Sequence, residues 1–229
     1  MSSTTRHLKA TIAVVVTLSA VAALLLGAGF AVSGPGRVAA QDEKSVVWDR
    51  YDVTLDLLGD GTYYVSERQV IDFRGGPFTG AFADIPLVRI EDIPMQYVVI
   101  GEELANGGIK PYTFVAYADY EEDPETYTVT KTSSQVSVKY GFTPTTNQPR
   151  TFILEYVVVG ALRVYEYPET PEESNQQIWW TAISDQVTEV APIRAATMTI
   201  NLPTAVDPAD VVMSVDDAHI PKDEVSNCS

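Results

Sequence analysis

The sequence has few of the residues that build catalytic and metal sites. Its only cysteine is Cys228, next to the last residue, so no internal disulfide can form and thiolates cannot assemble a structural zinc site. Its only histidines are His7 and His219, near the two ends of the chain. A histidine-dependent catalytic arrangement would have to use His219, and no GxSxG motif accompanies it. We therefore expect no metal and no cofactor, and we can name no catalytic residue.

Basic residues are also scarce. The chain has 15 lysines and arginines against 31 aspartates and glutamates, a net charge of -16. Without residues 1–40, which contain Arg6, Lys9 and Arg37, 12 basic and 31 acidic residues remain, a net charge of -19. A surface of this sign repels phosphate backbones, so nucleic-acid binding is not expected.

The first forty residues have the pattern of an export signal. Residues 10–32 read ATIAVVVTLSAVAALLLGAGFAV, without a charge, and Arg6 and Lys9 precede them. Glycine and proline follow at 34–36, and VAA precedes Gln41, which is typical of a signal peptide cleaved after Ala40. The run is also long enough to form a hydrophobic helix that anchors the chain in the membrane, because about 20 apolar residues span a bilayer. Either alternative predicts that the rest of the chain is exported across the cytoplasmic membrane.

After Gln41 the pattern becomes that of strands. In DRYDVTLDLL the residues Tyr51, Val53, Leu55 and Leu57 alternate with polar ones, which indicates a strand with one buried face. Further candidate strands begin at Met95, Tyr112, Tyr127, Gln135, Thr151, Ala161, Ile178, Ala195 and Val211. Clusters of Gly, Pro, Asn and Asp separate them, and no sustained helical periodicity appears. The sequence therefore predicts an all-β fold, an antiparallel β-sandwich of immunoglobulin-like or jelly-roll-like type, over residues 45–216, with a polar tail at 217–229.

The segment DLLGDGTYYVSE, residues 56–67, has some of the spacing of a calcium-binding EF-hand loop. Its third position is Leu58, which has no oxygen ligand, and the flanking segments are strand-like where an EF-hand needs helices. Gly59, Asp60 and Gly61 instead suit a tight turn. We expect a β-hairpin here.

Four segments resemble a known family. They are WDRYDVTLDLLGDGTYYVSERQVIDF, FRGGPFTGAFADIPL, TFILEYVVVGALRVY and IWWTAISDQVTEVAPIRAATMTINLP, in this order over roughly residues 48–203. Together they resemble the domain of unknown function 2207, found in predicted bacterial and archaeal membrane proteins. The resemblance implies an export signal, a β-rich extracytoplasmic domain and membrane-spanning segments further on. This chain differs at its end, where a polar stretch follows and no second apolar span appears, and the family has no assigned catalytic residues to transfer.

Among the carboxylates of the matching segments, Glu67, Asp72, Asp84 and Asp185 are the candidates for an acid and base pair, and Glu67 and Asp185 are also candidates for a functional surface. The alternative is that they are solvated strand or turn residues. The acidic run Asp119 to Glu125 could collect a calcium ion, but it lacks glycine and regular ligand spacing, so a solvated loop is favoured.

Trp179 and Trp180 are neighbours, so on a strand one ring should enter the core and the other should face outward. An outward tryptophan near Tyr165 and Tyr167 could stack on a sugar or a peptide, while simple packing is the alternative.

Three functions remain open from the sequence. We favour a non-enzymatic interaction or assembly module at the cell envelope, exported or tethered by residues 10–32, with an envelope protein or glycan as partner. The second is an exported hydrolase that acts on envelope carbohydrate through two carboxylates about 5–9 Å apart in a cleft. The third is a spacer in a larger membrane protein, which predicts no pocket of useful size.

Overall fold

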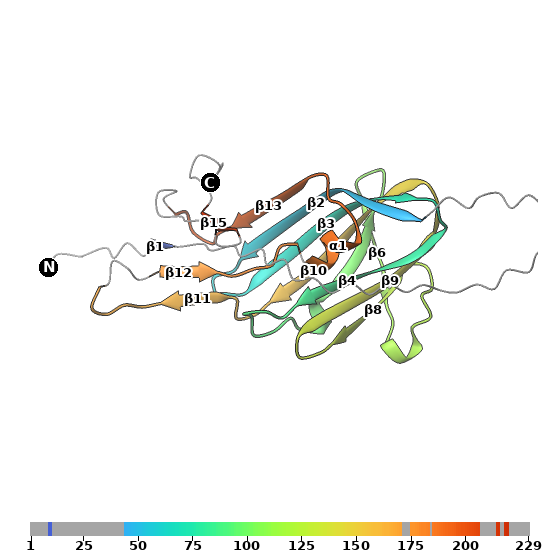
Figure 1. The fold of residues 1–229 in the computed structure, drawn as a ribbon. Helices are drawn as coiled ribbons and strands as arrows, with labels where there is room; N and C mark the ends of the chain where they lie inside the picture. Colours follow the sequence, from blue (N-terminus) through green and yellow to red (C-terminus); the bar gives the residue numbers. More distant parts are fainter. Residues whose placement is uncertain are drawn as a thin grey trace, which may run out of the picture.

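The computed structural model describes residues 9–10, 44–170, 175–183, 185–206, 214–215 and 218–219, and these residues are mainly β (Figure 1). The strands are β1 Lys9–Ala10, β2 Ser45–Leu57, β3 Tyr63–Arg74, β4 Phe78–Pro86, β5 Val99–Glu103, β6 Ile109–Pro111, β7 Thr113–Phe114, β8 Thr126–Lys131, β9 Gln135–Thr145, β10 Gln148–Val158, β11 Leu162–Tyr165, β12 Asn175–Ile178, β13 Ala196–Asn201, β14 Ser214–Val215 and β15 Ala218–His219. The helices are short: η1 Met95–Tyr97, η2 Tyr117–Asp119 and α1 Asp185–Val190. The expectation of a β-rich domain is confirmed.

The strands form mixed sheets. A six-stranded sheet has the order β13-β2-β3-β10-β5-β6, and a four-stranded sheet has the order β4-β9-β8-β7. Smaller sheets pair β1, β12 and β11, and β14 with β15. The expectation of purely antiparallel pairing is wrong, because β13 runs parallel to β2, β7 to β8 and β1 to β12.

The hairpin between β2 and β3 forms as the alternation predicts. Tyr51, Val53 and Leu55 are buried on one face of β2. In the turn, Gly61 has a φ of 84°, and the Asp60 carboxylate accepts hydrogen bonds from the Thr62 N–H at 3.0 Å and the Thr62 hydroxyl at 2.7 Å. The oxygen of Asp60 therefore holds the turn together.

The inward faces of the two larger sheets share one buried cluster. Its aromatic centre joins Tyr140 and Phe142 on β9 to Phe152 on β10, with ring centroids 5.0 Å and 5.3 Å from Phe152. Phe142 and Phe152 are fully buried, and burial of such a side chain is worth about 1.5–3 kcal/mol. This core fixes the strands on which the candidate site is built.

Several elements differ from the sequence expectation. β4 was not among the expected strands, because Gly80, Ala81 and Ala83 weaken its alternation. The glycine is needed there, since a Cβ at Gly80 would lie 2.9 Å from the Tyr140 carbonyl oxygen. The segment from Tyr112 forms only the short β7 before η2, and the strand expected from Met95 begins as η1.

The two ends of the chain are largely outside the described residues. Of the apolar run 10–32, only Ala10 is described, in β1, and the expected cleavage site is not. Of the last expected strand, Ser214 and Val215 form β14. None of the helices in the described part of the chain is both long and apolar enough to cross a membrane.

Gly141 on β9 gives the first testable prediction. A Cβ there would press on the carbonyl oxygen of Asp123 and would lie 2.5 Å from that of Glu122. Because both atoms are backbone, Gly141→Ala should lower the free energy of unfolding by about 1–3 kcal/mol in urea denaturation. The matched control is Gly59→Ala, where no heavy atom lies within 4 Å of the added Cβ. Equal stability of the two variants would contradict this close packing.

Candidate functional site

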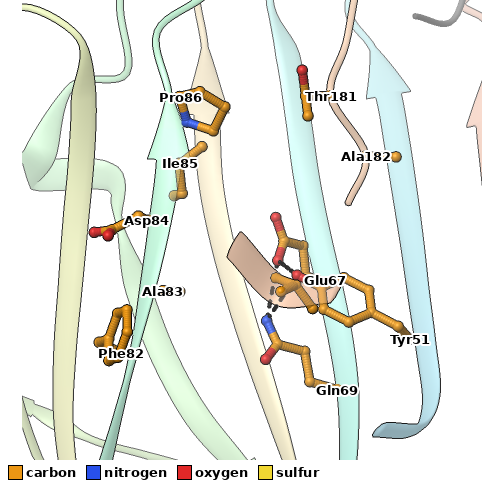
Figure 2. A pocket seen from close by; sticks show the side chains of 11 residues that line it. Tyr51, Glu67, Gln69, Phe82, Ala83, Asp84, Ile85, Pro86, Thr181 and Ala182 are labelled. Carbon is orange, nitrogen blue, oxygen red and sulfur yellow. Dashed lines mark hydrogen bonds between the residues drawn. The ribbon is translucent and has the colours of Figure 1, made fainter. Parts of the chain in front are cut away.

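A polar cluster is buried on the inward face of β2, β3 and β10. Glu67 on β3 is 5% exposed, and one of its carboxylate oxygens accepts a hydrogen bond from the Tyr51 hydroxyl at 2.5 Å. The other oxygen accepts one from the Tyr156 hydroxyl. The Gln69 amide donates at 3.1 Å both to the Tyr51 hydroxyl and to Glu67 (Figure 2). Three neighbouring strands thus supply four polar side chains that satisfy one another.

The position of Glu67 follows from the alternation of β3. Tyr63, Val65, Ile71 and Phe73 occupy its buried face, and Glu67 falls on the same face. Glu67 was expected to lie on the surface, and that placement is wrong. The signal was present in the sequence, because every second residue of this segment is inward.

Burial shifts the pKa values of this cluster. Desolvation raises the pKa of Glu67, although the hydrogen bonds from Tyr156, Tyr51 and Gln69 oppose that effect. Burial also raises the pKa of Tyr51 and of Tyr156 well above 10.0, and the Glu67 carboxylate adds to this. No Lys or Arg among the described residues pairs with Glu67. The carboxyl is therefore buried with neutral donors only.

A small hollow adjoins the cluster. It has a volume of about 30 Å³, which is room for about two water molecules. Figure 2 shows it between β4 and the strands that carry Tyr51, Glu67 and Gln69. Its lining is Tyr51, Glu67, Gln69, Phe82, Ala83, Asp84, Ile85, Pro86, Thr181, Ala182 and Val187. The segment around α1 thus contributes to the hollow beside β4.

The other candidate carboxylates have separate surroundings. Asp84 on β4 lines the same hollow as Glu67. Asp72 forms an ion pair at 2.9 Å with Arg74, on the same strand. Asp185 begins α1, and its side chain is outside the described residues. Of the three whose side chains the structure describes, Glu67 and Asp84 line one hollow, and Figure 2 shows the Asp84 carboxylate pointing away from Glu67, on the other side of β4.

The two tryptophans follow β12, outside any strand, and differ in burial. Trp180 is 4% exposed and packs on Tyr156, with ring centroids 5.8 Å apart. Trp179 is half-buried, and the Arg89 guanidinium lies 3.9 Å from the centre of its ring. One face of the Trp179 ring is thus already occupied by a cation, so that face is not open for stacking.

A largely buried ion pair was missed by the sequence reasoning. Arg150 on β10 donates to both carboxylate oxygens of Glu102 on β5, from Nε at 2.8 Å and from Nη2, and the side chains are 11% and 14% exposed. Arg150 also donates to the Thr143 carbonyl at 2.8 Å and lies 4.8 Å from the Phe142 ring. No local pattern could have shown it, because the partners are 48 residues apart.

An exposed apolar surface was also missed. Met95 and Tyr97 of η1, Phe114 of β7 and Tyr117 of η2 are 44%, 55%, 55% and 62% exposed, and all three elements contact β8. We call these four residues the β8 patch. Tyr127 on β8 anchors it, because its hydroxyl donates to the Val98 carbonyl at 3.1 Å and its ring lies 5.6 Å from that of Phe114. Phe114 is therefore held on the edge strand of the four-stranded sheet, and η1 and η2 contact the next strand, β8.

One solved structure shows a distant likeness to this chain. The crystal structure of a "putative protease" from Parabacteroides distasonis ATCC 8503 matches 53% of this chain and 25% of its own, at 6% identity and a TM-score of 0.31. The chain thus spans about a quarter of that protein, and a score this low does not establish a shared fold. No curated protein matches the sequence.

A family model, by contrast, covers most of the chain. The model described as "Predicted membrane protein (DUF2207) N-terminal domain" matches residues 48–227. The match includes the β2–β3 hairpin, the Glu67 cluster, the β8 patch and the four segments that resemble this family. The chain therefore belongs to the DUF2207 family, as the N-terminal domain of a predicted membrane protein.

Proposed function

We propose that this domain is a non-enzymatic interaction module, a β-sandwich held on the outer side of the cytoplasmic membrane, which docks a partner at the cell envelope. The observation that carries the proposal is the β8 patch. Soluble domains rarely gather large apolar side chains at one exposed place, and such surfaces commonly mark interaction sites. Tyrosine in particular is enriched where proteins meet.

The patch is preorganised for docking. Tyr127 anchors it through the hydrogen bond to Val98 and the contact with the Phe114 ring. The backbone of β7 is fixed beside β8 by two hydrogen bonds of 2.8 Å. The Thr113 N–H donates to the Glu125 carbonyl oxygen, and the Val115 N–H donates to the Tyr127 carbonyl oxygen. Because these contacts exist before any partner arrives, less conformational entropy is lost on binding.

Export is supported by two independent features. The family consists of predicted membrane proteins, and the apolar run 10–32 follows basic residues as in an export signal or anchor. The excess of acidic over basic residues in the remainder suits a domain that must stay soluble outside the cell.

A hydrolase is the second candidate, and one observation favours it: Glu67 and Asp84 line the same hollow. Two features weigh against it. Both oxygens of Glu67 already accept hydrogen bonds from side chains, and the hollow of about 30 Å³ is far below the roughly 300–1,000 Å³ of ligand pockets. A sugar ring would have to displace β4 or the segment around α1 to reach the carboxyl of Glu67.

Labelling and crosslinking in intact cells test the proposal. In a Cys228→Ser background, a Tyr117→Cys variant should react with a membrane-impermeant maleimide, because Tyr117 is 62% exposed. A photoreactive phenylalanine analogue at position 97, which keeps an aromatic ring in the β8 patch, should give a discrete crosslinked product. The product should be lost when Phe114→Asp is added.

Two control positions make this result specific. Leu154→Cys, at a site that is 1% exposed, should react only after denaturation. The same photoreactive residue at Thr199, on the exposed edge strand β13, should give no discrete product. Labelling of Tyr117→Cys only in broken cells would overturn the proposed location on the outer side of the cytoplasmic membrane. Equal crosslinking at positions 97 and 199, or no crosslinking at either, would contradict the interaction module and favour a role as a spacer in a larger membrane protein.

A further inference from the structure

The surroundings of the β8 patch are strongly acidic. The acidic loop, Asp119–Glu125, connects η2 to β8, and its residues Asp119, Glu121, Glu122 and Asp123 are exposed. Within the described part of the chain, none of these four carboxylates forms an ion pair. Two nearby lysines are already paired, Lys110 with Glu125 at 2.5 Å and Lys131 with Asp92. The four exposed carboxylates are therefore not neutralised by an ion pair within the described residues.

The acidic loop is fixed beside the patch by backbone contacts. The Glu125 N–H donates to the Gly141 carbonyl at 2.9 Å, and the Thr126 N–H and hydroxyl donate to the Asp123 carbonyl at 3.2 Å and 2.7 Å. Tyr127, whose ring contacts Phe114, follows directly. At its other end the loop shares Asp119 with η2, which also carries Tyr117. The loop thus lies between η2, which carries Tyr117, and Tyr127, whose ring contacts Phe114.

We propose that the β8 patch and the acidic loop together bind a cationic polypeptide segment, in which arginine or lysine side chains alternate with apolar ones. This inference rests on the proposed function and names the chemistry of its partner. Cations are attracted both by the faces of Tyr and Phe rings and by carboxylates. The apolar side chains of the same segment would cover Met95 and the ring edges, and their burial would supply most of the affinity.

Charge complementarity selects this occupant over the others. A second copy of the domain would bring the same acidic loop against the first, since the surface carries an excess of negative charge. Anionic lipid headgroups and phosphate backbones would be repelled for the same reason. A neutral lipid surface would contact the rings but would leave the carboxylates without partners. Of these occupants, only a cationic segment with apolar side chains would contact both the β8 patch and the acidic loop favourably.

Titration of the full chain with a synthetic peptide tests the inference. The probe is a fluorescein-labelled peptide that alternates arginine with leucine. The control peptide has glutamate in place of every arginine. The arginine peptide should bind with an anisotropy change that weakens as salt rises, and the glutamate peptide should not bind. Phe114→Ala combined with Tyr117→Ala should weaken binding by about tenfold or more. Glu121→Gln combined with Glu122→Gln should weaken it by about three- to tenfold at low salt.

A charge-matched control shows where on the surface binding occurs. Asp60→Asn combined with Glu189→Gln removes two negative charges at the β2–β3 turn and on α1, so its net charge equals that of the Glu121 and Glu122 variant. Asp60→Asn keeps the oxygen that holds the turn. This control should bind the arginine peptide as the parent does, within about twofold. If it weakens binding as much as the acidic-loop variant, attraction is non-specific and the inference is overturned.

Further outcomes separate this inference from the proposed function. If neutral phosphatidylcholine vesicles bind through the β8 patch and the arginine peptide does not, the partner is lipid and the inference fails. If the crosslink at position 97 forms in cells but the arginine peptide cannot compete it away, the interaction module stands and the cationic partner is wrong. Competition for that crosslink by the arginine peptide, and not by the glutamate peptide, supports both.

Discussion

Arg150→Ala is expected to lower the free energy of unfolding by about 3–5 kcal/mol, because it removes one partner of a buried ion pair. Glu102 would lose its arginine partner at a site where its side chain is only 14% exposed, with the Tyr112 hydroxyl at 3.2 Å as a remaining donor. The Thr143 carbonyl and the Thr145 hydroxyl would also lose the hydrogen bonds that Arg150 donates at 2.8 Å and 3.0 Å. Urea denaturation followed by tryptophan fluorescence measures the loss.

Two comparisons establish the cause of that loss. Arg74→Ala removes an arginine that is 49% exposed and paired with Asp72, and should cost no more than about 1 kcal/mol. Arg150→Met combined with Glu102→Leu should be less destabilising than Arg150→Ala alone, since no unpaired charge remains in the double variant. A loss below about 1 kcal/mol for Arg150→Ala would show that water reaches Glu102 and replaces the guanidinium.

The strand pattern of the sequence predicts some parts of this structure well. The alternation of Tyr51, Val53 and Leu55 correctly predicts which face of β2 is buried. The same alternation continues through β3, so the inward position of Glu67 was available from the sequence. It was missed because a carboxylate is seldom buried and was therefore assigned to solvent. A polar residue that falls on the apolar face of a strand should instead be predicted to be buried with hydrogen-bond partners.

Other parts depend on contacts between distant segments. The parallel pairing of β13 with β2 joins residues such as Thr197 and Asp52, and nothing local in either strand indicates a partner or a direction. The β8 patch arises for the same reason, since η1, β7 and η2 each contact β8 in the folded chain. The sequence shows that Tyr97, Phe114 and Tyr117 are aromatic, but their exposure results from the packing of the folded chain.

The buried carboxyl of Glu67 gives the domain a pH-dependent stability. Its pKa is raised in the folded state above the ordinary value of 4.5. Folding then favours the protonated form, so this contribution to stability is fully present below pH 4.5 and is lost as pH rises through the folded pKa. The ionised form of Glu67 has only the neutral donors Tyr51, Tyr156 and Gln69 around it.

Two variants at position 67 should therefore behave in opposite ways. Glu67→Gln keeps the shape and cannot ionise, so its melting temperature relative to the parent should rise as pH is increased from 4 towards 7. Glu67→Ala leaves the Tyr51 and Tyr156 hydroxyls without their acceptor and opens a cavity, and should cost about 3–5 kcal/mol. Thermal unfolding of the three proteins across this pH range measures both effects.

A difference in melting temperature between Glu67→Gln and the parent that stays constant with pH would show that the carboxyl is not desolvated in the folded domain. A small loss for Glu67→Ala would show that water from the adjoining hollow takes over the hydrogen bonds of the carboxylate.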